Sequence, residues 1–340
     1  MRTLLTLDYE VFFGPRTGSV RRCLLEPVAA LAALAERHRA KLVFFVDAGF
    51  LLRMRAEIGR TPQLRADHDA VCRQVEALAR AGHEIQLHIH PHWEDARFEG
   101  GAWQVGLEHY ALQSFPPARI AEIVREYAGV LRELAGDASA FAYRAGGWLV
   151  RPFEPIRPAL LANDVRIDST VFAGGRRGGA VQSFDFRAAP AKSRWHFDRD
   201  PLREASGGPF LEVPIASCRV GPLFFWKLAA ARKLGGARHR TFGDGEPIAL
   251  DRGDLASKLL APSTSVVSLD GYKAACVAAE FDRYRARGLE DFVVIGHPKA
   301  LTPFGLARLA EFLSSRRPHI ATYAAYRDEI APARDARVAA

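Results

Sequence analysis

The chain has 340 residues, of which 49% are hydrophobic and 25% are charged. This balance is typical of a globular protein and excludes a disordered or fibrous chain. The length allows two domains of roughly 150 residues or one α/β barrel. No apolar run approaches the roughly 18 residues that a membrane-spanning helix needs. The formal net charge is +8, and its position along the chain matters more than its size.

The N-terminus and the cysteines indicate the compartment. The chain reaches Asp8 after a few apolar residues and offers no small-residue cleavage site, which predicts a first core strand rather than a signal peptide. The four cysteines, Cys23, Cys72, Cys218 and Cys276, form neither a C-x-x-C pair nor a zinc-finger spacing. We therefore expect a cytoplasmic, reduced protein without disulfides.

Short β-type runs alternate with longer helical stretches along the chain. Strands are expected at 3–7, 41–46, 84–88, 140–143, 165–167, 211–215, 293–295 and 319–323. Helices are expected at 24–38, 67–81, 118–134, 154–162 and 302–313. This alternation predicts a parallel sheet covered by helices, and about seven repeats favour closure into a barrel. The chain has no G-x-G-x-x-G after the first strand and no P-loop motif, which argues against both nucleotide-binding folds.

Two stretches interrupt this rhythm, 173–209 and 219–264. We interpret both as elaborated loops of one barrel domain that spans 1–325, followed by a C-terminal tail at 326–340. Within the second stretch, Arg219–Arg240 holds six basic residues and no acid around the run Leu-Phe-Phe-Trp, and so carries most of the net charge. It fits either a solvated basic helix or an amphipathic insertion that contacts a membrane surface or an anionic lipid-linked substrate. No nucleic-acid motif accompanies the charge, so we expect no nucleic-acid partner.

Polar residues gather where the predicted strands end. The C-terminal strand ends of a (β/α) barrel converge on one face, and that face holds the active site. Three of the 11 histidines, His88, His90 and His92, fall within five residues after the third strand. Neutral imidazole is a favoured zinc ligand, so we expect two of the three to bind a metal. All three share a face only if the extended backbone continues, which Pro91 makes uncertain.

Acidic and basic groups at the other strand ends complete the predicted site. Of Asp8 and Glu10, one carboxylate can complete a His-His-carboxylate metal set while the other acts as general base on the attacking water. Arg144, which precedes two glycines, is expected to keep the base carboxylate ionised and oriented. His297 follows the apolar run 292–295 and is expected to act as the general acid that protonates a leaving amine.

At these residues the chain resembles the polysaccharide deacetylase (NodB-like) family, carbohydrate esterase family four. The family motif G-H-E-I-x-x-H-[ST]-x-x-H is matched by GHEIQLHIHPH at 82–92, and the strand motif T-F-D-D by TLDYE at 6–10. The family's arginine falls on Arg144, its D-S-S segment on the run that begins at Asp168, and its closing histidine on His297.

The resemblance implies a distorted or incomplete (β/α) barrel of the polysaccharide deacetylase type with elaborated loops. It implies zinc or another divalent ion on His88 and His92, and hydrolysis of N-acetyl groups from amino sugars. Because the family's adjacent aspartates are replaced here by Asp8-Tyr9-Glu10, either Asp8 is the base and Glu10 binds the metal, or Asp8 itself binds it. Asp47 and His90 are further candidate ligands, and Asp47 is also a candidate base.

The remaining expectations concern the substrate. Tyr9, Trp93 and Trp148 are candidates for stacking on sugar faces, and Asp168 is a candidate substrate contact. We expect an acetamido sugar of lipopolysaccharide, O-antigen or capsule assembly, carried on a nucleotide or a polyprenyl diphosphate. The alternatives are hydrolysis of another amide or ester, and a barrel that binds carbohydrate or metal without turnover.

Overall fold

One mixed sheet organises the protein, and a computed structural model describes it for residues 1–179, 181–249 and 259–330. Within these residues the sheet has nine strands, in the order β10-β11-β7-β6-β3-β2-β1-β14, with β15 also paired to β1. They are β1 (Arg2–Tyr9), β2 (Val43–Asp47), β3 (Glu84–Ile89), β6 (Ala142–Ala145), β7 (Ile167–Asp168), β10 (Trp195–Phe197), β11 (Phe210–Glu212), β14 (Asp291–Gly296) and β15 (His319–Ile320). All pairs are parallel except β10 with β11.

The ring of parallel strands curls but does not close through a continuous ladder. Between β11 and β14 only isolated parallel bridges occur, Ile215 with Val293 and Ser268 with Ile295. The amide of Ala216 donates to the carbonyl of Val293 at 2.8 Å, so the chain leaving β11 spans the gap. The predicted distorted or incomplete (β/α) barrel is therefore confirmed.

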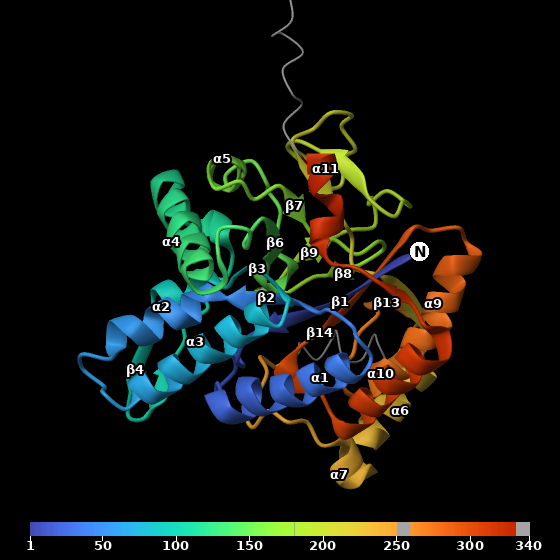
Figure 1. Cartoon of the computed structure of the whole chain (residues 1–340), viewed down its shortest axis with the longest axis horizontal. Helices are drawn as coiled ribbons and strands as arrows, with labels where there is room; N and C mark the ends of the chain where they lie inside the picture. The colour runs from blue at the N-terminus through green and yellow to red at the C-terminus, as the bar shows by residue number, and fades with distance from the viewer. Residues whose placement is uncertain (180, 250–258, 331–340) are drawn as a thin grey trace, which may run out of the picture.

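Helices cover the outside of the strands (Figure 1). They include α1 (Glu26–Arg37), α2 (Ala48–Glu57), α3 (Leu64–Arg80), α4 (Pro117–Ala135), α5 (Arg157–Ala162), α9 (Val277–Ala286) and α10 (Pro303–Arg316). Further helices are α6 (Pro222–Leu234), α7 (Gly236–His239) and α11 (Arg327–Ile330), and small two-stranded sheets pair β4 (Arg97–Glu99) with β5 (Ala102–Gln104), β8 (Arg176–Arg177) with β9 (Phe184–Asp185), and β12 (Ser217–Val220) with β13 (Ser263–Val266). No helix in the described ranges is long and apolar enough to cross a membrane.

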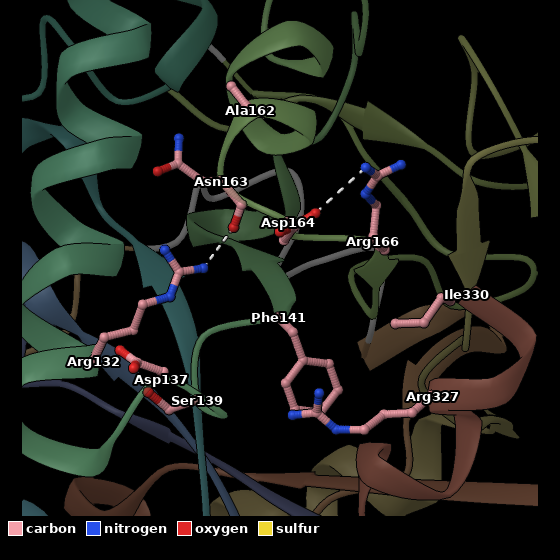
Figure 2. Close-up of a pocket in the computed structure, with 10 residues that line it drawn as sticks. All are labelled: Arg132, Asp137, Ser139, Phe141, Ala162, Asn163, Asp164, Arg166, Arg327 and Ile330. Atoms are coloured by element: carbon pink, nitrogen blue, oxygen red, sulfur yellow. Dashed lines mark hydrogen bonds and ion pairs between the residues drawn. The ribbon is translucent and has the colours of Figure 1, made fainter. Parts of the chain in front are cut away.

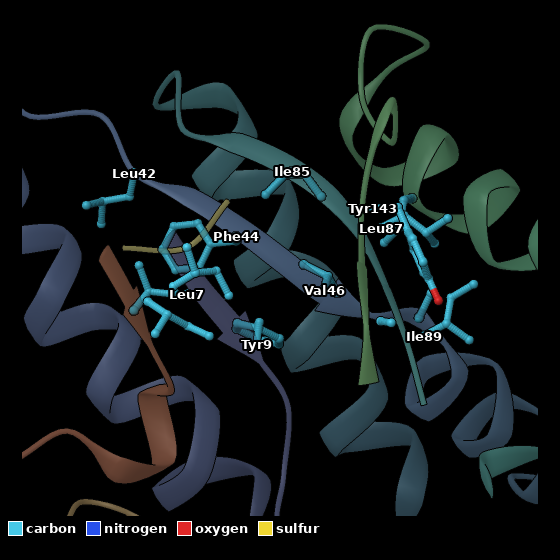
Figure 3. Close-up of a cluster of buried hydrophobic side chains, with 14 of the residues drawn as sticks. Leu7, Tyr9, Leu42, Phe44, Val46, Ile85, Leu87, Ile89 and Tyr143 are labelled. Carbon is cyan, nitrogen blue, oxygen red and sulfur yellow. The ribbon is translucent and has the colours of Figure 1, made fainter. Parts of the chain in front are cut away.

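The alternation of side chains along each strand divides the core into two clusters. Outward residues such as Leu7, Phe44 and Leu87 pack under the helices (Figure 3). Inward residues such as Leu4 and Phe45 fill the barrel. Because the side-chain period of a strand is two, the inward positions of β1, β3 and β6 also carry polar residues toward the barrel mouth.

Most predicted elements lie within a few residues of the observed ones, with clear exceptions. The sequence pattern missed α2, whose apolar residues follow β2 without a turn. Residues 326–330, assigned to the tail, are folded: Tyr326 is fully buried and its hydroxyl donates to Asp291 at 3.0 Å. Residues 331–340 of that tail and 250–258 of the predicted insertion lie outside the described ranges. The division into one domain with two insertions stays a prediction.

Candidate metal and catalytic site

Two carboxylates stand at the C-terminal end of β1 on the inner side of the sheet. Asp8 is inward and Tyr9 outward, because successive residues of a strand face opposite sides. The hydroxyl of Tyr9 therefore meets Gln74 of α3, at 2.9 Å. Glu10 follows the strand on the inner side and, like Asp8, is buried. The replacement of an adjacent acid pair by alternate positions thus keeps both carboxylates inside the barrel.

Glu10 forms a buried cluster with two histidines. Its Oε2 lies 3.0 Å from Nε2 of His88 and 2.6 Å from Nε2 of His90. These three side chains are the one group of potential metal ligands within the described residues whose donor atoms all lie within 4.8 Å of one another. One carboxylate and two imidazoles form a donor set of the kind that zinc uses in catalytic sites.

The structure groups His90 with Glu10 and His88, where the family resemblance implied His92. His88 belongs to β3 and His90 keeps an extended backbone (φ −109°, ψ 95°), so the two side chains point the same way. A 3₁₀ turn begins at Pro91 and ends the alternation. His92 is consequently turned against Phe13 and Tyr110, with its ring stacked on that of Tyr110 at a centroid distance of 5.7 Å. Its assignment as a metal ligand stays a prediction.

Backbone contacts fix the orientation of His88. Its Nδ1 lies 2.8 Å from the carbonyl of Arg144, which accepts only from a protonated Nδ1 and so directs Nε2 at Glu10. Burial opposes a charge on His88, but the carboxylates of Asp8 and Glu10 outweigh it and raise its pKa to about 9. A divalent ion between His88 and Glu10 would replace that proton, as metal binding does generally.

Lys299 is a cation of the site that the sequence did not reveal. Its ammonium lies 2.8 Å from Oε1 of Glu10 and also donates to the carbonyl of Val11. Burial alone would raise the pKa of Glu10, but Lys299 and His90 hold it well below its usual range. Lys299 thus fixes one carboxylate oxygen and leaves the other facing the histidines.

Buried polar atoms without partners show that the cluster fits a metal ion. Both ring nitrogens of His92, Nδ1 of His90 and Oδ1 of Asp47 are buried and make no hydrogen bond. Such atoms are rare in folded proteins and indicate a site for an ion or water, or a functional role. Burial lowers the pKa of His90 to about 4 and that of His92 well below its usual range, so both rings are neutral, as metal ligands must be.

Asp8 is held by a fully buried arginine. Nη1 of Arg144 lies 2.6 Å from Oδ1 of Asp8, and Nε donates to the carbonyl of Ser169 at 2.8 Å. The guanidinium also stacks over the ring of Phe45 at 4.1 Å. Arg144 therefore balances the charge of Asp8 and fixes its orientation, which leaves Oδ2 free.

His297 completes the cluster from the end of β14. Its Nε2 lies 3.6 Å from Oδ2 of Asp8 and 3.8 Å from Oε1 of Glu10. Its Nδ1 lies 2.8 Å from Oδ2 of Asp270, and its backbone amide donates to Oδ1 of the same residue at 2.8 Å. Burial opposes a charge on His297, but Asp270, Asp8 and Glu10 outweigh it and raise its pKa.

Asp47 and the predicted sugar-stacking residues do not line the pocket that opens onto the cluster. Oδ2 of Asp47 accepts from the indole N–H of Trp93 at 2.6 Å, and burial raises the pKa of Asp47 to about 7. Trp93, like Tyr9, is buried in the core and leaves no ring face open to a sugar. Trp148 packs against Phe172 outside the pocket described next.

Asp168 lies behind Arg144. It is 1% exposed and accepts from the hydroxyl of Thr170 at 2.7 Å. Beside it, Glu212 is also fully buried, and burial followed by the charge of Asp168 raises the pKa of Glu212 well above its usual value. A substrate therefore cannot reach the carboxylate of Asp168 in this structure.

A pocket of about 560 Å³ opens onto the cluster. It is lined by Glu10, Phe12, Phe13, Tyr110, Arg232, His239, Arg240, Thr241, Gly245, Pro247, Ile248, His297, Lys299 and Ala300. The sequence pattern missed Phe13, which stacks on His90 at 4.2 Å, and Tyr110. Neither residue lies in a strand, so the alternating pattern of strand residues could not indicate that it faces the site.

A second, larger cavity, of about 660 Å³, lies at the opposite end of the strands (Figure 2). It adjoins the N-terminal ends of β6 and β7 and includes Arg132, Arg166 and Arg327. Their guanidiniums are engaged: Arg132 donates to the carbonyl of Asn163, Arg166 pairs with Asp164 at 3.4 Å, and Arg327 stacks over Phe141 at 3.9 Å. This end of a (β/α) barrel is the one associated with stability rather than chemistry.

Comparisons with known proteins were made for sequence and for structure. No family model matches the sequence, and no curated protein matches it. Among solved structures, the chain is similar to a Mycobacterium smegmatis protein provisionally assigned as a polysaccharide deacetylase, with 15% identity and a TM-score of 0.51 over 97% of this chain and 89% of that one. This similarity shows the fold.

Two other solved structures are similar at lower TM-scores. A family 4 carbohydrate esterase from Streptomyces lividans, in complex with acetate, has 10% identity and a TM-score of 0.39, over 94% of this chain and 91% of that one. A family 4 acetyl xylan esterase from Clostridium thermocellum, in complex with a cobalt ion, has 12% identity and a TM-score of 0.38, over 97% and 91%. The fold of this chain is that of the Mycobacterium smegmatis structure, as the motif resemblance predicted.

Proposed function

We propose that this protein is a metal-dependent hydrolase of the polysaccharide deacetylase type that removes an N-acetyl group from an amino sugar. The observation that carries the proposal is the convergence of Asp8, Glu10, His88, His90 and His297 at the C-terminal strand ends, beside one pocket. The fold, shared with a structure provisionally assigned to the same activity, supports it.

Glu10, His88 and His90 would hold the divalent ion, zinc or another transition metal, with His92 and Asp47 as further candidate ligands. When bound, such an ion polarises a carbonyl oxygen and lowers the pKa of a coordinated water toward about 7. The carbonyl of Arg144 orients His88, and Lys299 orients Glu10, in the way that outer hydrogen bonds generally position metal ligands.

Asp8 is the proposed general base. Its Oδ1 is bound by Arg144, so its Oδ2 is the oxygen that can take the proton of the attacking water. Rotation of the carboxylate is prevented by the guanidinium, which is itself fixed by Ser169 and Phe45. Arg144 is therefore a positioning residue for Asp8.

His297 is the proposed general acid. Asp270 holds Nδ1–H, so Nε2 is the nitrogen that faces the reacting groups. The surrounding carboxylates raise the pKa of His297 and favour the protonated ring that can give its proton to the departing sugar amine. Asp8 and His297 thus lie on the same side of the cluster, with Oδ2 and Nε2 3.6 Å apart.

Two observations bear on where the reaction takes place. The four cysteines are free, which fits a reducing compartment such as the cytoplasm. Helix α6 exposes Leu223 and Trp226 beside Lys227 and buries none of its residues. We propose that the substrate belongs to lipopolysaccharide, O-antigen or capsule assembly, and that Arg219–Arg240 makes a peripheral membrane contact. Flotation with anionic but not zwitterionic liposomes is expected, and equal or no flotation would contradict this contact.

The test of the proposed function measures acetate release together with bound metal. The wild type should bind about one divalent ion per chain and release acetate from acetamido sugars, and His88→Ala or His90→Ala should lose both. His319→Ala, an exposed histidine at the other end of β1, is the matched control and should retain both. Release from acetyl esters alone would favour esterase activity, and metal binding without acetate release from either class would favour binding without turnover.

A further inference from the structure

The pocket that holds Glu10 and His297 has a basic wall from outside the barrel. Arg232 of α6, His239 of α7 and Arg240 line it together with the reacting groups. Helix α7 packs on α10: the ring of His239 stacks on Phe304 at a centroid distance of 4.5 Å. The basic wall is therefore held in place by packing against α10, the helix that follows His297 in the chain.

Within the described residues, the two arginines of this wall have no carboxylate partner. Several other arginines of the protein do have one, as Arg157 has Asp198 and Arg187 has Asp185. Across the described residues, Arg232 and Arg240 form neither an ion pair nor a hydrogen bond through the side chain. Nδ1 of His239 is buried and also lacks a partner. In the part of the chain that the structure describes, the two guanidiniums and the imidazole nitrogen of His239 therefore lack a partner at this pocket.

The charge of the pocket is not balanced from within. Among the described lining residues Glu10 is the one acid, and that carboxylate is already engaged by Lys299 and the histidines. The guanidiniums of Arg232 and Arg240 therefore present uncompensated positive charge beside the reacting groups. Guanidinium groups of this kind recognise phosphate and carboxylate through paired N–H donors.

A fixed strap, residues 241–248, bounds the pocket on the side of Phe12. The amide of Gly14 donates to the carbonyl of Glu246 at 3.0 Å, and the hydroxyl of Ser19 donates to Asp244 at 2.8 Å. A side chain at Gly245 would come within 2.6 Å of Phe12, so only glycine allows this approach. The walled pocket, at about 560 Å³, falls in the range of small-molecule sites, roughly 300–1,000 Å³.

We propose that this pocket binds an acetamido sugar bearing a phosphate group, with the phosphate on Arg232 and Arg240 and the acetamido group at Glu10 and His297. The apolar residues Phe12 and Ile248 line the space between and would pack against the sugar ring. This inference rests on the proposed function for the reaction, but the phosphate subsite is independent of turnover. A nucleotide diphosphate and a lipid diphosphate both supply the same phosphate chemistry.

The test compares the binding of phosphorylated and neutral sugars by calorimetry. N-acetylglucosamine 1-phosphate should bind about 10- to 100-fold more tightly than N-acetylglucosamine, since charge-assisted contacts of this kind are worth about 1.5–3 kcal/mol. In the double variant Arg232→Ala/Arg240→Ala this ratio should fall to about 1. The ratio should persist in Lys233→Ala/Arg238→Ala, which removes the same amount of charge from α6 and α7, at residues that do not line the pocket.

UDP-N-acetylglucosamine and a short-chain polyprenyl diphosphate N-acetylglucosamine in detergent micelles distinguish the two phosphate sources. Tighter binding of either one than of N-acetylglucosamine 1-phosphate, lost in Arg232→Ala/Arg240→Ala, identifies that source. Equal affinity for phosphorylated and neutral sugars, or a ratio that the double variant leaves intact, would overturn the inference.

Acetate release on the same compounds separates this inference from the proposed function. If the phosphate-dependent binding holds and no compound is deacetylated, the subsite stands and the hydrolase proposal fails. If neutral chito-oligosaccharides are deacetylated with a kcat/KM equal to that of the phosphorylated sugars, the hydrolase proposal stands and the subsite fails.

Discussion

The two ends of the barrel both hold buried or half-buried charges, yet they differ in how these charges are satisfied. At the N-terminal strand ends, the arginines of the second cavity contact backbone carbonyls, an aspartate and an aromatic ring (Figure 2). At the C-terminal strand ends, His92 and His90 retain ring nitrogens with no partner, and three carboxylates lie within 4 Å of His297. Within the described residues, buried imidazole nitrogens without partners, rather than the number of charges or the size of a cavity, distinguish the reactive end of the strands.

The largest difference between the two ends should appear in the catalytic rate. Asp8→Asn removes the proposed base but retains an oxygen that Arg144 can bind, so the fold should persist while kcat falls about a thousandfold. Asp137→Asn, in the cavity at the other end, is the control and should leave kcat unchanged. Steady-state acetate release decides this, and an Asp8→Asn enzyme within tenfold of the wild type would remove Asp8 from the role of base.

A second comparison concerns stability. Arg144→Met leaves Asp8 buried without its partner and should cost about 3–5 kcal/mol of unfolding free energy. Arg132→Met removes contacts to two backbone carbonyls at a partly exposed position and should cost about 1–2 kcal/mol. Urea denaturation measures both values. Equal losses of unfolding free energy would contradict the expectation that the buried charge pair at the C-terminal end contributes more to stability.

Lys299→Met tests the link between the lysine and the metal cluster. Loss of the ammonium from Glu10 should destabilise the metal-free protein by about 2 kcal/mol, because a hydrogen bond to a charged group is lost while the histidines still contact Glu10. Added zinc should then raise the Tm of the variant more than that of the wild type, since the ion supplies the missing positive charge. Lys41→Met, whose ammonium contacts the carbonyl of Ala81 at the other end, should respond to zinc as the wild type does.

The smallest expected effect is a pH dependence at the N-terminal end. The amide of Leu42 donates to Nδ1 of His83 at 3.1 Å, and burial, with the nearby Lys41, lowers the pKa of His83 to about 4 from 6.5. Above pH 6.5 the ring is neutral in both states and its contribution is fully present. As the pH falls from about 6.5 to 4, the unfolded chain takes up a proton that the folded chain does not, so stability is lost.

His83→Gln keeps an acceptor but does not titrate. Between pH 7 and pH 4.5 the wild type should therefore lose on the order of 1 kcal/mol more stability than the variant, measured by urea denaturation at each pH. Parallel pH curves for the two proteins would contradict the assignment.

The sequence predicted the framework of the fold because strand periodicity is a local property. The runs at 3–7 and 84–88 gave β1 and β3 with Asp8 and His88 on the inner side, and the fold comparison confirms the predicted barrel type. The pattern could not decide between His90 and His92, since that depends on where the extended backbone ends. The 3₁₀ turn at Pro91 settles which side chain lies beside Glu10.

The contacts that tune the site were beyond sequence reasoning. Lys299 lies in a short 3₁₀ turn and Asp270 lies in a loop. Their positions beside Glu10 and His297 depend on how β14 and the preceding segment pack. Tyr9 and Trp93 resembled sugar-binding aromatics, but both pack in the core, where the hydroxyl of Tyr9 contacts Gln74 and the indole N–H of Trp93 contacts Asp47. The one feature of the sequence that could have indicated a role for Lys299 in the site is its place two residues after His297.

The central claim is that Glu10, His88 and His90 hold a divalent ion beside Asp8 and His297. Anomalous diffraction from crystals grown with zinc or cobalt tests it most directly. A single strong peak within ligand distance of Oε2 of Glu10 and Nε2 of His88 and His90 is the predicted result. No peak at this cluster, with Lys299 still bound to Glu10 at a saturating metal concentration, would contradict the account.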